Sequence, residues 1–129
     1  MFRRMGRLQN RTPVIASRDD VHPGDDPVDY RFDIEQDAAP EVLLRRTADR
    51  HWLPSIQGDR ATWVIASNEV LAVLAYEWSD LRFMPLLELR MQNVHRRDGV
   101  LRVHFSYFGQ TDPDMVYRIL WRLKLRPDP

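Results

Sequence analysis

What this sequence lacks already narrows its chemistry. There is no cysteine among its 129 residues, which excludes a disulfide framework, a thiol nucleophile and any thiolate metal site. No apolar run approaches the roughly 18 residues that a membrane-spanning helix needs, so we expect no membrane association. The basic start of the chain has no apolar core of a secretory signal, and we therefore expect a cytoplasmic protein.

Excess charge and catalytic motifs are missing as well. The 19 lysines and arginines balance 19 acidic residues, and nucleic-acid affinity comes largely from excess positive charge, so nucleic acid is not an expected partner. The chain has only five glycines and no glycine-rich phosphate loop, no nucleophile elbow and no HExxH pair. We accordingly assign no catalytic residues and expect no cofactor.

Alternating apolar and polar residues are the clearest positive signal. Side chains of a strand point to opposite faces in turn, so a period of two indicates a strand with one buried face. Three stretches show it: Tyr30 to Glu35, Leu87 to Gln92 and Leu101 to Tyr107. Residues 61–66 and 69–78, joined by a hairpin at Ser67 and Asn68, are apolar at nearly every position, which predicts that both of their faces are covered.

The remaining elements complete the expected fold. Residues 13–17 predict an edge strand, and residues 38–51 a helix capped by Asp37. The strand of residues 82–92 leads through a turn at residues 95–99 into the strand of residues 100–108. A final helix starts near Asp112, with a buried face that comprises Met115, Val116, Ile119, Leu120 and Leu123.

Together these elements predict the α+β class. We expect a two-layer sandwich in which a curved, mainly antiparallel sheet of about five strands carries both helices on one face. Residues 13–129 form this single domain, and residues 1–12 form a flexible basic segment.

An acidic loop is the first candidate site. It combines five carboxylates with an imidazole: Asp19, Asp20, His22, Asp25, Asp26 and Asp29. Such a loop forms an electrostatic patch that can steer and hold a basic partner protein. An alternative is a divalent-cation site made of Asp19, His22, Asp25 and Asp26, because oxygen and nitrogen donors suit Mg²⁺, Mn²⁺ or Zn²⁺. A solvated turn remains the plain alternative to both.

Two further groups of residues attract attention. Tyr117 and Trp121 lie one helical turn apart and, with Arg118 and Arg122, have the composition enriched at binding hot spots. His104 lies mid-strand on the expected polar face, but a general base needs a partner and an orienting group. The sequence offers no Ser–His–Asp order that supplies them.

The overall plan resembles that of immunity proteins, which neutralise bacterial toxins: small, cysteine-free, α+β, with an acidic loop beside a sheet. The resemblance is architectural and rests on no specific motif. It implies a non-enzymatic, protein-binding module that inhibits a co-encoded toxin domain one to one. The competing hypothesis is a small metal-dependent enzyme that uses the loop of residues 19–29.

Overall fold

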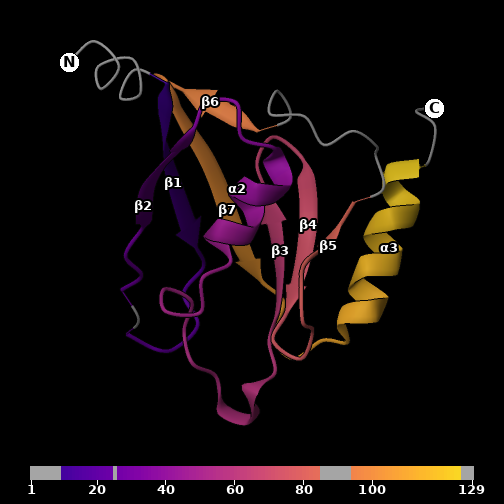
Figure 1. The fold of residues 1–129 in the computed structure, drawn as a ribbon. Helices are drawn as coiled ribbons and strands as arrows, with labels where there is room; N and C mark the ends of the chain where they lie inside the picture. The colour runs from indigo at the N-terminus through magenta and orange to yellow at the C-terminus, as the bar shows by residue number, and fades with distance from the viewer. Residues whose placement is uncertain (1–9, 25, 85–93, 126–129) are drawn as a thin grey trace.

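The described residues form one sheet with a helix on each side of it (Figure 1). The computed structural model describes residues 10–24, 26–84 and 94–125. The strands are β1 (Arg11–Arg18), β2 (Tyr30–Glu35), β3 (Thr62–Ala66), β4 (Val70–Ala75), β5 (Arg82–Phe83), β6 (His95–Arg97) and β7 (Val100–Tyr107). The helices are α2 (Pro40–Thr47) and α3 (Pro113–Leu125), with a 3-10 turn, η1, at Gln57–Asp59.

The sheet is mixed, with seven strands in the described part of the chain, in the order β2-β1-β7-β3-β4-β5. β1 pairs with one edge of β7, and both β3 and β6 pair with the opposite edge. β1 runs parallel to β7, with Ser17 opposite His104, whereas the other pairings are antiparallel. The expected curved antiparallel sheet of about five strands is therefore wrong. Alternation identifies strands but not their neighbours, and nothing in it predicts that the first strand inserts beside the last.

The two faces of the sheet are covered by different helices. On one face Trp63 and Ile65 of β3 pack into the main core, which includes the fully buried Leu43 and Leu44 of α2. On the other face Val64 of β3 and Val73 of β4 pack with Val116 of α3. The prediction that β3 and β4 are covered on both faces is thus correct. The prediction that both helices lie on one face is wrong, because α3 covers the second apolar face of these strands.

Several boundaries also differ from expectation. α2 ends at Thr47 rather than His51, and it starts after Ala39, whose extended backbone suits a residue before proline, with no side-chain cap from Asp37. Of the expected turn at residues 95–99, only Asp98 and Gly99 turn the chain, with φ of 53° and 77°, as a tight hairpin requires. Residues 1–9 and 85–93, with most of the expected basic segment of residues 1–12 and much of the strand of residues 82–92, lie outside the described residues. Arg11 and Thr12, at the end of that segment, belong to β1.

The expected buried face of α3 is largely wrong. Val116 is buried and Leu120 packs half-buried beside it, but the other three apolar positions are exposed: Met115, Ile119 and Leu123. A helix that covers only the end of a sheet contacts it along a narrow strip. The rest of its apolar surface therefore stays in contact with water.

Candidate functional site

The outward face of α3 carries an unusual share of exposed apolar side chains. Met115, Ile119 and Leu123 are 50%, 53% and 57% exposed, and Trp121 is 38% exposed. The first three are spaced by four residues and so form one stripe along the helix. Met115 and Ile119 each lie two residues from Tyr117, about 200° around the helix. The stripe therefore lies on the flank opposite to Tyr117.

A hollow of about 660 Å³ adjoins the other flank. Tyr117 and Trp121 line it together with Arg82, Asp112, Asp114, Arg118 and Arg122. The Tyr117 hydroxyl donates a 2.6 Å hydrogen bond to the carbonyl oxygen of Phe83, which fixes this flank against β5. The aromatic and arginine residues predicted from the sequence do come together here. Of the two aromatic side chains, Tyr117 is half-buried and Trp121 is exposed.

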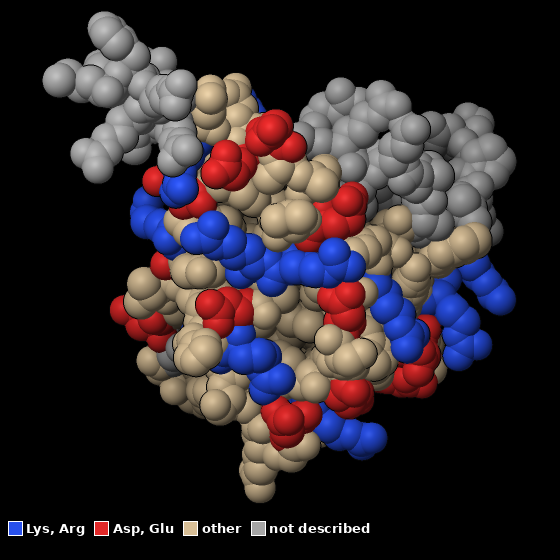
Figure 2. Space-filling view, viewed as in Figure 1, with Lys and Arg blue, Asp and Glu red and all other residues tan. Residues whose placement is uncertain are grey.

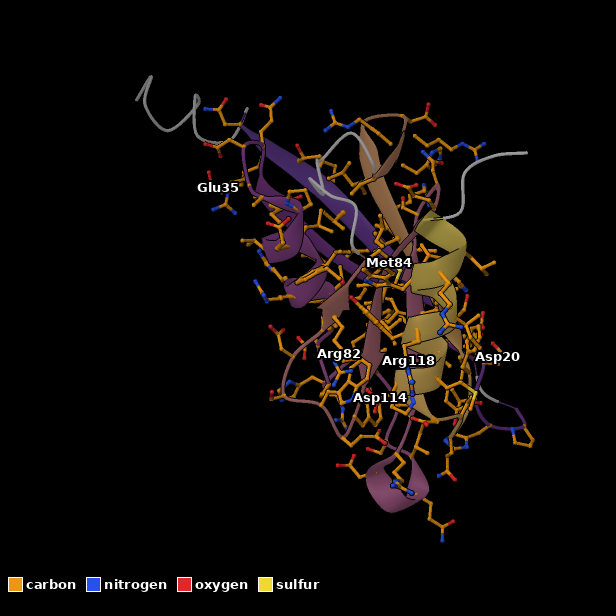
Figure 3. All side chains as sticks on the ribbon, turned by 90° about the vertical axis from the view of Figure 1, so that its right-hand side faces the viewer. Asp20, Glu35, Arg82, Met84, Asp114 and Arg118 are labelled. Carbon is orange, nitrogen blue, oxygen red and sulfur yellow. The ribbon has the colours of Figure 1, made fainter. Side chains whose placement is uncertain are left out.

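Two arginines run between the stripe and the hollow without a carboxylate partner in the described part of the chain. Arg118 donates only a long 3.5 Å hydrogen bond to the Asp114 carbonyl oxygen, and neither it nor Arg122 forms an ion pair with any described residue. The neighbouring Asp114 is already engaged by Arg82, 2.5 Å away (Figure 3). Arg82 also stacks on Trp78, 3.8 Å from the ring centre. We call Met115, Arg118, Ile119, Trp121, Arg122 and Leu123 the α3 surface.

The two arginines of α2, and Arg50 just after the helix, are by contrast all engaged within the chain. Arg45 makes a two-pronged contact with Asp80, at 3.0 Å and 3.2 Å. Arg46 lies over Phe32, and Arg50 contacts Asp59 at 2.7 Å. The hydrogen bond from Arg45 lowers the pKa of Asp80. Basic and acidic side chains are accordingly interspersed over the face that α2 covers (Figure 2).

The acidic loop is divided by the fold. Asp20, His22, Asp26 and Asp29 are exposed, whereas Asp25 lies outside the described residues. Asp19 turns inward and accepts hydrogen bonds from the ring of His104 and from the backbone N–H of Tyr107. Among the described residues, no three His, Asp or Glu side chains gather closely enough to hold a metal ion.

A second cluster lies on the same face of the sheet as α3, over β1 and β7 rather than over β3 and β4, where α3 packs. His104 of β7 bonds through Nδ1 to Ser17 Oγ at 2.7 Å and through Nε2 to Asp19 Oδ1 at 2.7 Å. Asp19 is in turn held by the Tyr107 N–H, 2.9 Å from its other oxygen. No sequence motif predicts this Ser–His–Asp arrangement, because the parallel pairing of β1 with β7 creates it. Only the polar position of His104 pointed toward it.

A small pocket of about 200 Å³ opens beside Ser17 and His104. Its lining combines Ile15 and Ala66 with the polar residues Ser67, His95 and Arg102. Ser67 is committed to the backbone, since its hydroxyl donates to the Arg102 carbonyl oxygen and accepts from the His95 N–H. Ser17 is therefore the pocket serine whose hydroxyl faces an imidazole.

Fold and sites together define a small α+β protein with an open helix surface and a polar cluster on a mixed sheet. Compared with models of known protein families, with curated proteins and with solved structures, the chain matches none of them. Neither helix in the described ranges has the length and hydrophobicity needed to span a bilayer.

Proposed function

We propose that this chain is a protein-binding module that docks its partner on the α3 surface. The observation that carries the proposal is the stripe of exposed side chains that Met115, Ile119 and Leu123 form on one short helix, with Trp121 exposed on the far side of Arg118 and Arg122. Contiguous exposed apolar surface bordered by polar residues is typical of a protein interaction site. Aromatic side chains, methionine and arginine are also the residue types enriched in interfaces.

The charge on this surface defines the chemistry of the partner. Arg118 and Arg122 run along the apolar stripe and have no carboxylate partner in the described part of the chain. A partner segment that buries the stripe has to place acidic groups opposite both guanidinium groups, because an unpaired buried charge is costly. We therefore propose an acidic, amphipathic protein segment as the occupant.

Synthetic peptides provide a defined probe for this proposal. An array of 12-residue peptides built from Leu, Phe, Asp and Glu is compared with the same array carrying Lys at every acidic position. We expect the full chain to bind members of the acidic array, with affinities measured by fluorescence anisotropy. Binding should weaken as salt is added, because charge pairs contribute to it.

Two variants locate the binding on the protein. The double variant Arg118→Glu, Arg122→Glu and the single variant Ile119→Asp should each weaken binding by about tenfold or more, as the loss of a hot spot does. The matched control is Arg96→Glu, Arg97→Glu, which makes the same charge change at exposed positions of β6. Absence of binding to the acidic array, or equal binding by all variants, would overturn the proposal.

The immunity role is a second proposal of the protein-binding class, with a co-encoded toxin domain as the partner. The exposed carboxylates of Asp20, Asp26 and Asp29 support a basic partner at the acidic loop instead of α3. In a purified pair, a one-to-one complex lost in the Asn variant of these three residues but kept in the α3 variants would assign binding to the loop. A complex with the opposite response would assign binding to α3. Failure of the pair to form any complex would exclude the immunity role.

A further inference from the structure

The Ser17–His104–Asp19 chain has the parts of an activated nucleophile, and it is separate from the α3 surface. Ser17 lies near the end of β1, Asp19 directly follows this strand, and His104 comes from the middle of β7. Because Ser17 and His104 stand opposite each other in the parallel register, both side chains leave the sheet on the same face. Two strands rather than a loop thus hold the two groups at 2.7 Å.

The hydrogen bonds select one arrangement of protons. A carboxylate can only accept, so the proton shared with Asp19 belongs to Nε2 of His104. The neutral ring then has its lone pair on Nδ1, where the Ser17 hydroxyl donates. His104 is therefore poised to take the Ser17 proton, and Asp19, fixed by the Tyr107 N–H, orients the ring.

Access favours a reactive role over a purely structural one. The side chains of His104 and Asp19 are each 44% exposed, and the 200 Å³ pocket opens beside Ser17. This volume is below the range of about 300–1,000 Å³ typical of sites for drug-sized ligands. The pocket accordingly suits a short acyl group, and Arg102 in its lining supplies a positive charge for a developing oxyanion.

We propose that Ser17 is a catalytic nucleophile that cleaves esters of short-chain carboxylic acids, with His104 as general base and Asp19 as its positioning residue. Ser17 Oγ bonds to the acyl carbon while its proton passes to His104 Nδ1. The ester C–O bond then breaks, and the departing alcohol takes that proton. Water next attacks the acyl-serine as His104 accepts its proton, and the carboxylic acid leaves as Ser17 is reprotonated.

Two probes test the nucleophile in the full chain. A fluorophosphonate should attach covalently to Ser17, located by mass spectrometry of the digested protein. p-Nitrophenyl acetate should be hydrolysed faster than p-nitrophenyl decanoate, because the pocket is small. Ser17→Ala should abolish both signals, and Arg102→Gln should slow acetate hydrolysis.

Matched variants separate catalysis from structure. Ser106→Ala removes a half-buried hydroxyl from the same face of β7 and should leave both signals unchanged. His104→Gln and Asp19→Asn should each lower the acylation rate by at least about a hundredfold, the usual lower bound of general-base catalysis. The acylation rate of the unaltered chain should rise with pH, and this dependence should vanish in His104→Gln. Labelling that is absent, or that persists in Ser17→Ala, would overturn the proposal.

Discussion

The two helices cover the two faces of one sheet in opposite ways. α2 buries Leu43 and Leu44 completely, and its two arginines contact a carboxylate or an aromatic ring of the same chain. α3 buries chiefly Val116, and it leaves apolar side chains exposed beside two arginines without a carboxylate among the described residues. A helix whose apolar and charged side chains find partners within the same chain contributes to the stability of the fold. A helix whose exposed side chains lack such partners is available to bind another protein. The substitutions below test this difference between the two helices.

The largest effect should come from the buried face of α2. Leu44→Ala removes a fully buried side chain from the main core and should lower the free energy of unfolding by about 2–5 kcal/mol, since it leaves a cavity. Urea unfolding followed by tryptophan fluorescence measures this change. A loss below about 1 kcal/mol would contradict the conclusion that α2 contributes strongly to the main hydrophobic core.

A smaller loss should follow the equivalent change in α3. Val116→Ala removes two methyl groups at the contact with Val64 and Val73, worth about 1.5 kcal/mol at ~0.8 kcal/mol for each buried group. The same urea titration measures it. If Val116→Ala cost as much as Leu44→Ala, the two helices would contribute equally to the core, and the comparison would fail.

The pairing of α2 arginines should appear in the pH dependence of stability. Arg45 lowers the pKa of Asp80 below its ordinary value of 3.8, so this carboxylate stabilises the fold above that pH. The contribution is lost as the pH falls through the lower, folded-state pKa. Asp80→Asn should therefore show a shallower fall in Tm between about pH 5 and pH 3 than the unaltered chain. Identical slopes would mean that the pair contributes nothing.

The smallest effect on stability should come from the exposed stripe of α3. Ile119→Ser removes a side chain that is 53% exposed, and the free energy of unfolding should change by no more than about 0.5 kcal/mol. Peptide binding should nevertheless fall. A large loss of stability would show that Ile119 serves the fold rather than a partner.

Local pattern predicted much of the fold. The strands around Tyr30, Trp63 and Leu101 appear where alternation or apolar runs indicated them, and α3 begins at Pro113 with Asp112 bonded to the Asp114 N–H. These features depend on a few adjacent residues, whose side-chain period and capping chemistry act locally. The end of α2 was missed because Asp49 bonds the His51 N–H and ring instead of continuing the helix.

The candidate sites were less predictable. Asp19 and Trp121 were singled out from the sequence, but Asp19 as part of an acidic surface rather than as a partner of His104. Helical periodicity predicts that Met115 and Ile119 are buried, because it gives the apolar side of a helix and not the width of the surface that covers it. Nothing in the sequence marks Ser17 as a site residue, because 87 positions separate it from His104.

The sequence by itself determined the α+β class, most strand positions and the double-sided burial of β3 and β4, because periodicity and local residue chemistry act over short stretches. Tertiary structure alone decided which strands are neighbours, which face each helix covers and which side chains meet. Insertion of β1 parallel to β7 brings Ser17 and Asp19 onto His104. The position of α3 at the β4–β5 end of the sheet leaves its apolar stripe uncovered. Both outcomes depend on contacts between segments far apart in the chain, which no local pattern encodes.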